Sequence, residues 1–361
     1  MTAATATLAC TALVGCQPDG GMQSWPPSVA DEEEDPTNNS DEEPRMMISQ
    51  PATTAIEDLC HLESDNLSAA IHLQSGRVME FRPAGGDNVL WTNPSELERE
   101  DLAFSNHGGD KVWPWPQSEW IGGEWPPPAP FNGGTWKADV SSHRVTLTCD
   151  ESDHYGVRPT RIIEQDAAGL TVRSDLERTA NDENPPAAAA WHVTQIPRDA
   201  GAIVAIARDD SPAEPVWLND PNRPEDLAEL VTAAGDIDGR VVWQLNSLPD
   251  RNGKAGLDGD ILAADVNGTL FVQYLAAGEG EMYSNDAHRL QVYIHVPVDE
   301  DPVIDETVGS WAELEMTSPL GSPTHPASLT VRWLLAETEA GDAKSIAKQA
   351  IAMVEQDRNR N

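Results

Sequence analysis

Short stretches in which apolar and polar residues alternate recur along most of this chain, and they constrain its fold more than any other feature. In the segments 145–149, 290–296 and 329–335 every second residue is apolar. A period of two places one set of side chains on the core face of a β-strand and the other set on the opposite face. The segment 68–81 has the pattern of two strands joined by a tight turn at Gln74-Ser75-Gly76. Many short strands separated by Gly, Pro and Asn clusters predict an all-β sandwich or barrel.

One segment has helical periodicity. In 345–356 apolar residues fall at i, i+4, i+7 and i+8 from Ile346, which places them on one face of an α-helix. We expect a short C-terminal helix that closes the fold by packing on the rim of a sheet. No break in composition marks a second domain after residue 56, so 56–361 are expected to form a single domain.

The N-terminus has the composition of an export signal. Residues 1–16 are uncharged, small and apolar, and they are too few to span a bilayer as a helix. Leu13-Val14-Gly15-Cys16 resembles the lipobox of bacterial lipoproteins, which implies that residues 1–15 are removed and that Cys16 is lipidated. The alternative is an ordinary secretory signal in which this cysteine occurs by chance. By analogy with enteric bacteria, Gln17 favours sorting to the outer membrane, facing the periplasm or the surface.

An acidic segment follows this cysteine. Residues 16–55 contain the runs DEEED and DEE among several Pro, Ser and Asn residues, with too few large apolar side chains to form a core. We expect a disordered tether and a lipid anchor as the only membrane contact. The whole chain has 61 acidic and 23 basic residues, a formal net charge of −38. This charge argues against nucleic acid as a partner, because phosphate binding requires clustered Lys and Arg.

Two cysteines remain after the signal segment, Cys60 and Cys149. An exported compartment permits a disulfide between them. The alternative is that both stay reduced and pack as small hydrophobic residues.

Tryptophan is concentrated in one segment. Residues 105–136 hold five of the twelve Trp residues of the chain, among them Trp113 and Trp115. Pro and Gly residues predict a long irregular loop here, a kind of segment that often carries function on a β scaffold. Indole faces suit the apolar face of a sugar ring, and a neighbouring polar residue such as Asp110 suits its hydroxyls. The alternative is that the tryptophans pack as a lid over the core.

Polar residues interrupt several otherwise apolar strands. In the strand predicted at 191–195, His192 points away from its two neighbours, and in the strand predicted at 313–316, Glu313 and Glu315 share a face. Histidine has a suitable pKa for proton transfer near neutral pH, and a carboxyl in an apolar pocket has its pKa raised towards that range. The alternatives are a structural His and a solvated acidic face.

The order of these elements is similar to that of the galactose-mutarotase-like superfamily. Asn106-His107-Gly108-Gly109 is similar to the His-Gly-Gly motif of mutarotases, His192 is similar in position to their general acid, and Leu314-Glu315-Met316-Thr317 is similar to the motif with the general base. The resemblance covers about residues 56–336. It implies a β-supersandwich with a sugar cleft and an aldose 1-epimerase reaction that needs neither metal nor other cofactor.

The resemblance also implies roles for individual residues. Glu315 would take the proton of the C1 hydroxyl, His192 would protonate the ring oxygen, and His107 would make a second contact there. Asp286 is the candidate for the family's sugar-binding Asp. Apart from the resemblance, we interpret the segment 250–260 as a turn; the alternative is that Lys254 in this segment reaches an anionic sugar.

Two functions therefore remain open for an exported lipoprotein whose expected partner is a mono- or oligosaccharide. The first is an aldose 1-epimerase or related isomerase. The second is a non-catalytic carbohydrate-binding or cell-envelope module on the same fold. A polysaccharide lyase is less favoured because Tyr is rare in this chain, and a hydrolase because Asp and Glu are too abundant for a catalytic pair to be singled out.

Overall fold

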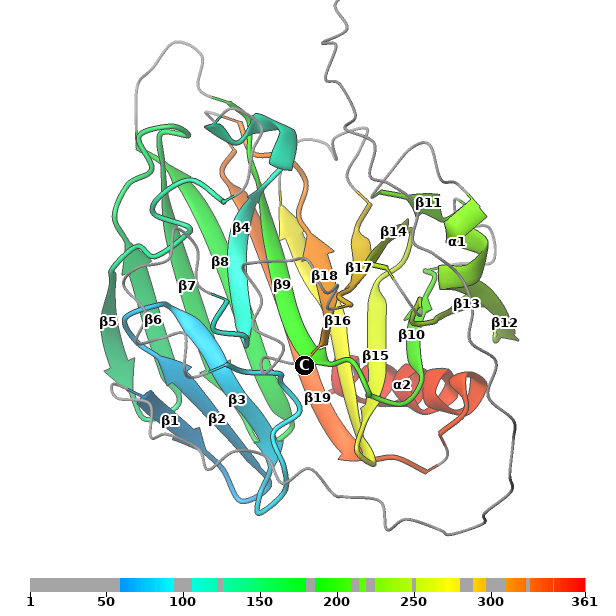
Figure 1. Cartoon of the computed structure of the whole chain (residues 1–361). Coiled ribbons are helices and arrows are strands. Elements are labelled where there is room, and N and C mark those ends of the chain that lie inside the picture. The colour runs from blue at the N-terminus through cyan, green and yellow to red at the C-terminus, as the bar shows by residue number, and fades with distance from the viewer. Residues whose placement is uncertain are drawn as a thin grey trace, which may run out of the picture. The chain divides into compact units, whose positions relative to one another are not determined.

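The computed structural model of the chain is shown in Figure 1. It describes residues 59–93, 106–121, 126–179, 186–208, 214–218, 225–248, 251–279, 288–296, 310–322, 325–339 and 341–360. The expected signal segment, the lipidation site Cys16, the acidic tether and Asp286 lie outside the described residues.

Two antiparallel sheets make up the described part of the chain (Figure 1). The first has, in spatial order, β1 (Leu59–Glu63), β2 (Leu67–His72), β3 (Arg77–Pro83), β4 (Asp110–Trp115), β9 (Ala189–Pro197), β18 (Trp311–Thr317), β17 (Leu290–Ile294), β14 (Gly253–Leu257) and β11 (Val216–Trp217). The second has β12 (Val231–Ile237), β13 (Arg240–Leu245), β10 (Ile203–Ile206), β15 (Ile261–Val266), β16 (Thr269–Glu279), β19 (Ala327–Glu337), β8 (Gly169–Arg178), β7 (Val157–Gln165), β6 (Arg144–Cys149) and β5 (Trp136–Ser141). The described helices are a 3-10 turn (Gln117–Glu119), α1 (Glu225–Leu230) and α2 (Ala343–Arg358). The predicted all-β class with a C-terminal helix is confirmed.

The main core lies between the two sheets. Phe81 of β3 meets Phe271 of β16 and Trp333 of β19 edge to face, with ring centroids 6.0 and 5.6 Å apart. Edge-to-face packing lets the positive edge of one ring contact the negative face of the next. In β6 the apolar members of the alternating pattern are buried, as the sequence predicts. The predicted hairpin also forms, since β2 pairs with β3 around the turn at 73–76.

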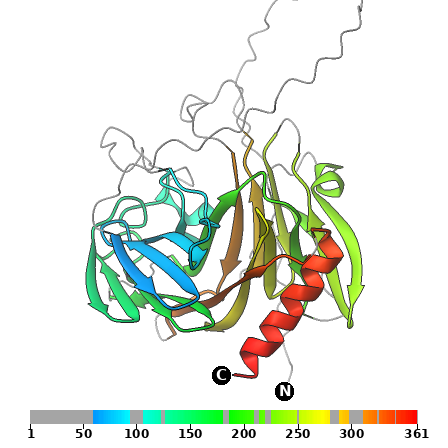
Figure 2. The same ribbon diagram turned by 90° about the horizontal axis from the view of Figure 1, so that it is seen from below.

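The C-terminal helix covers a face of the second sheet instead of its rim, so the prediction of a rim position is wrong. Ile346, Ala350 and Val354 of α2 are buried against a second apolar cluster on β10, β15 and β16, and Figure 2 shows the helix lying along this sheet. The sheet presents apolar residues on both faces here, so one face packs on the first sheet and the other requires the helix. Asp342 begins the helix by accepting a hydrogen bond from the backbone N–H of Ser345.

Two segments interpreted from the sequence as irregular contain strands. The Trp-rich segment 105–136 includes β4, which lies between β3 and β9 in the interior of the first sheet. The segment 250–260 includes β14, which carries Lys254. Gly and Pro residues in the first segment, and Gly residues in the second, hid the short strands.

The thiols of Cys60 and Cys149 are free in the structure. Cys60 lies on β1 of the first sheet and Cys149 on β6 of the second, where its Sγ is 3.6 Å from the carbonyl oxygen of Thr135. Within the described residues, no helix is long and apolar enough to cross a membrane.

Candidate functional site

Strand β9 divides its side chains between two environments. His192 and Thr194 point towards the second sheet, where they contact Ser174 of β8 and Gln273 of β16 at 2.6 and 2.8 Å. Because neighbouring side chains in a strand point to opposite faces, the residues between and beside them lie on the other face of the first sheet. We call this the outer face.

Polar side chains from five adjacent strands meet on the outer face, and all of them except Lys254 are buried there. We call them the outer-face cluster: Lys111 of β4, Trp191 and Gln195 of β9, Glu313 and Glu315 of β18, Gln291 of β17 and Lys254 of β14. Register places them on one face, because Glu315 pairs with Gln291 on one side and with Val193 on the other, and Val193 pairs with Lys111. The prediction that Glu313 and Glu315 share a face is confirmed.

Glu315 lies at the centre of the cluster and is fully buried, at 0% exposure. Its Oε2 accepts hydrogen bonds from Trp191 Nε1 at 2.7 Å and Lys254 Nζ at 2.9 Å. Its Oε1 is buried and has no hydrogen-bond partner among the described residues. Burial raises the pKa of Glu315 to about 7, with Glu313 adding to the shift and Lys254 opposing it. A carboxyl group with this pKa changes protonation near neutral pH.

Lys111 forms the second ionisable centre. Its Nζ is buried 3.5 Å from Oε1 of Glu313, an oxygen that also accepts hydrogen bonds from Gln195 Nε2 at 2.8 Å and Trp311 Nε1 at 3.2 Å. Burial lowers the pKa of Lys111 to about 8; Glu313 opposes this shift and Arg77 adds to it. Lys111 and Glu315 are therefore an amine and a carboxyl whose pKa values have moved towards each other.

Indole rings surround the cluster. Trp191 contacts Trp113 and Trp115 edge to face, with centroids 5.5 and 5.0 Å apart. Lys111 Nζ lies 4.4 Å from the centroid of Trp113, and Lys254 Nζ lies 4.4 Å from that of Trp191. Trp113 and Trp115 are almost fully buried, so they form the walls of the cluster.

Two predicted site residues lie on the face that packs against the second sheet. His192 contacts Ser174 through Nε2, and burial lowers its pKa well below the usual value. Asp110 forms a buried ion pair with Arg161 and accepts a hydrogen bond from Thr194 Oγ1 at 2.9 Å. The structure therefore does not bring His192 or Asp110 together with Glu315, and it supports neither the acid role of His192 nor the sugar-binding role of Asp110.

His107 lies beside the cluster. Burial lowers its pKa to about 2, and the charges of Arg77, His72 and Lys111 add to the shift, so the imidazole is neutral at physiological pH. The two glycines that follow have positive φ angles, 81° for Gly108 and 68° for Gly109. A Cβ atom on Gly109 would collide with the carbonyl oxygen of Val78, which explains the residue type at this position.

Four members of the cluster were not predicted from the sequence as site residues: Lys111, Trp191, Gln195 and Gln291. Lys111 alternates with Trp113 and Trp115, so recognition of β4 as a strand would have placed it on the same face. Gln291 is fully buried, and neither atom of its amide group has a hydrogen-bond partner among the described residues. A buried amide without partners is costly, so this side chain is a candidate for binding a polar ligand.

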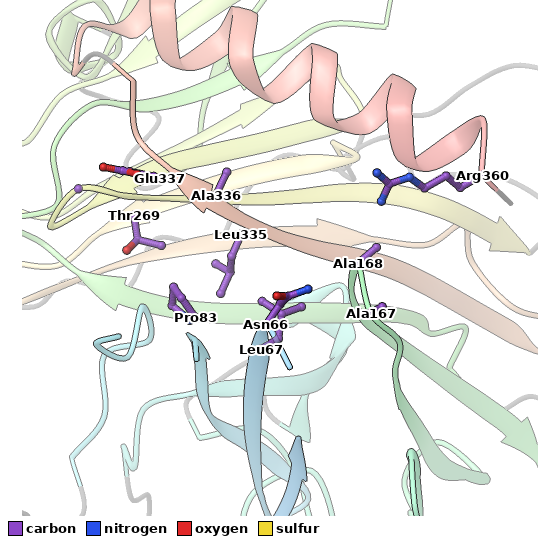
Figure 3. A pocket seen from close by; sticks show the side chains of 11 residues that line it. Asn66, Leu67, Pro83, Ala167, Ala168, Thr269, Leu335, Ala336, Glu337 and Arg360 are labelled. Carbon is purple, nitrogen blue, oxygen red and sulfur yellow. The ribbon is translucent and has the colours of Figure 1, made fainter. Parts of the chain in front are cut away.

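Other described features are separate from the cluster. Within the described ranges, no group of three His, Cys, Asp or Glu side chains is arranged to hold a metal ion. A pocket of about 410 Å³ lies at the ends of several strands, lined by residues that include Pro83, Leu335, Glu337 and Arg360 (Figure 3). None of its lining residues belongs to the outer-face cluster.

Comparisons with known proteins show similarity of fold only. No protein-family model matches the chain, and no curated protein does. Among solved structures, a galactose mutarotase-like protein from Lactobacillus casei is similar, at 12% identity and a TM-score of 0.49, over 77% of this chain and 100% of that chain. A galactose mutarotase related enzyme from Lactobacillus acidophilus is similar at 9% identity and a TM-score of 0.46, over 79% of this chain and 99% of that chain.

Proposed function

We propose that this protein binds a carbohydrate at the outer-face cluster and interconverts its anomers, as an aldose 1-epimerase does. One observation carries the proposal: Glu315 and Lys111 lie on either side of Val193 on one buried face, with pKa values of about 7 and about 8. Ring opening needs a base for one oxygen and an acid for the other, and both work best when their pKa values lie near the working pH.

The spacing of the two groups suits a sugar ring. Strands are spaced about 4.8 Å apart, and β9 lies between β4 and β18, so the Cα atoms of Lys111 and Glu315 are about 10 Å apart. A pyranose ring above Val193 would have one group near its C1 hydroxyl and the other near its ring oxygen. The indole rings of Trp113 and Trp191 supply apolar walls for the C–H bonds of the sugar.

The proposed reaction follows from these positions. Glu315 Oε1 takes the proton of the C1 hydroxyl, the bond between C1 and the ring oxygen breaks, and a carbonyl group forms at C1. Lys111 gives its proton to the ring oxygen, while His107 serves as a neutral contact there. After rotation about the C1–C2 bond, the same steps in reverse close the ring on the other face. Lys111 thus takes the role that the resemblance assigned to His192.

Anomer exchange measured by NMR tests this proposal. The full chain is added to freshly dissolved galactose, glucose and uronic acids, alongside Glu315→Gln, Lys111→Met and the control Glu164→Gln, which changes an exposed carboxyl. We expect faster exchange with the wild type and the control, and none above background with the other two. Saturation-transfer contacts without faster exchange would favour the non-catalytic carbohydrate-binding module. If the protein shows neither faster exchange nor saturation-transfer contacts, both functions are refuted.

We also propose that the chain is exported and lipid-anchored through Cys16, as its N-terminal sequence indicates. Labelling with a radioactive fatty acid in a bacterial host tests this. The wild type should take up the label and Cys16→Ser should not, whereas equal labelling of both proteins would refute the anchor.

A further inference from the structure

Lys254 reaches the base from a distant strand. It belongs to β14, and β17 separates that strand from β18. Its Nζ nevertheless lies 2.9 Å from Glu315 Oε2 and over the ring of Trp191 at 4.4 Å. The ring of Trp115 is 5.9 Å from the same atom. The side chain is 15% exposed, so most of its length is packed.

These contacts leave little of the ammonium group for a substrate. One side of it donates to a carboxylate, and two indole faces take up other directions. An anionic sugar that bound Lys254 would first have to separate it from the fully buried Glu315, and breaking a buried ion pair is strongly unfavourable. The contacts therefore fit a supporting role better than the sugar-binding role expected from the sequence.

The two oxygens of Glu315 are unequal as a result. Oε2 receives two donors, from Trp191 and Lys254, on strands to either side of β18. Oε1 has no hydrogen-bond partner among the described residues. Glu315 pairs with Gln291 on β17, and the amide group of Gln291 also has no hydrogen-bond partner among these residues. Rotation of the carboxyl group would exchange the oxygens and would break both hydrogen bonds.

We propose that Lys254 and Trp191 form a clamp that fixes Oε2 of Glu315 and leaves Oε1 as the oxygen that accepts the substrate proton, with Lys254 as a positioning residue. This inference rests on the proposed function for its catalytic meaning, but the clamp itself is a property of the protein without substrate. Its charge also matters, because an ammonium group favours the ionised carboxylate.

The charged groups facing Glu315 can be named strand by strand. Lys254 approaches from β14. Glu313 lies on β18, the strand of Glu315 itself, and Lys111 lies beyond Val193 on β4. Trp191 contributes an uncharged donor from β9. Lys254 is the cation that bonds directly to the carboxylate, so its removal should move the titration of Glu315 upwards by about one pH unit or more.

The experiment measures the protonation of Glu315 in the full chain, by ¹³C NMR of labelled Glu side chains and by Trp fluorescence as a function of pH. The variants are Lys254→Met, Lys254→Arg, Trp191→Phe and the control Lys137→Met, which changes an exposed lysine. We expect the midpoint to rise by at least one unit in Lys254→Met, which lowers the ionised fraction at pH 7 about fivefold. Lys254→Arg and Lys137→Met should keep the wild-type midpoint, and Trp191→Phe should raise it by a smaller amount.

Activity then separates a clamp from a substrate ligand. A clamp predicts that the acidic limb of kcat in Lys254→Met moves with the NMR midpoint, while KM for neutral sugars stays within about twofold. An unchanged midpoint in the folded variant, or a rise in KM restricted to anionic sugars, would overturn the inference. If Lys254→Met fails to fold, a wild-type midpoint in folded Trp191→Phe would also overturn it. A shifted midpoint in a protein that never accelerates anomer exchange would support the clamp and refute the proposed function.

Discussion

Replacement of Glu315 by Gln should change how the stability of the protein depends on pH. Burial raises the pKa of Glu315 in the folded state from an ordinary 4.5 to about 7. Between these values the folded state keeps a proton that the unfolded state has released. The contribution of the residue to stability is therefore complete below pH 4.5 and is lost as the pH rises through 7.

The magnitude follows from the size of the shift. A difference of about 2.5 pKa units, at about 1.4 kcal/mol per unit, corresponds to at most about 3.5 kcal/mol. Between pH 5 and pH 8 most of this, about 2–3 kcal/mol, should be lost by the wild type. Gln does not titrate, so the variant lacks this loss. The amide leaves Lys254 without its carboxylate, which lowers the stability of the variant at every pH in this range.

The free energy of unfolding, measured in urea at pH 5, 6, 7 and 8, checks this prediction. His107 contributes with the opposite sign, because its lowered pKa makes stability rise with pH between about 2 and 6.5. Both proteins contain His107, so its contribution cancels in their difference. That difference should move by about 2–3 kcal/mol in favour of the variant between pH 5 and pH 8. A difference constant to within about 0.5 kcal/mol would show that Glu315 is ionised throughout this range.

Three further predictions follow from buried contacts. The lowered pKa of Lys111 makes the free energy of unfolding of the wild type rise between pH 8 and 10.5, and Lys111→Met should lack this rise. Equal slopes of unfolding free energy against pH for the two proteins, measured in urea, would contradict this. Ile346→Ala should cost about 2–5 kcal/mol by leaving a cavity under α2, and a loss below about 1 kcal/mol in the same assay would argue against this packing. Gly109→Ala should lower the melting temperature by several degrees, because its φ is positive and its Cβ would meet Val78; calorimetry showing no change would refute this account.

Much of the fold could be predicted from the sequence, because alternation is strong wherever a strand has one apolar face. The hairpin at 68–81, the strand at 145–149 and the C-terminal helix all formed as expected. Strand β4 was missed because it is only six residues long, and Pro114 and the surrounding Gly and Trp residues obscure its alternation. The position of α2 was also beyond the pattern, because an amphipathic helix shows that it has a partner but does not show which surface that partner is.

The site was predictable in part for a related reason. Alternation placed Glu313 and Glu315 on one face and His192 opposite its neighbours, and the structure agrees with both. Which face turns towards the second sheet depends on contacts between residues far apart in sequence, such as His192 with Ser174. Lys111 and Gln291 gave no motif, because a single polar residue on a strand becomes a site residue only through the strands paired beside it.

Alternate residues of strand β9 have different neighbours: one set packs against the second sheet, and the other set lies in the candidate site. His192 and Thr194 complete contacts between the sheets, while Trp191 and Gln195 hold the carboxyl groups of β18. A single-residue deletion within this strand would exchange the two faces for the residues on one side of the deletion, and it would place their polar atoms in the wrong environment. Natural or laboratory change of specificity at this strand is therefore confined to substitutions at alternate positions, and insertions or deletions will be tolerated only in the connections outside it.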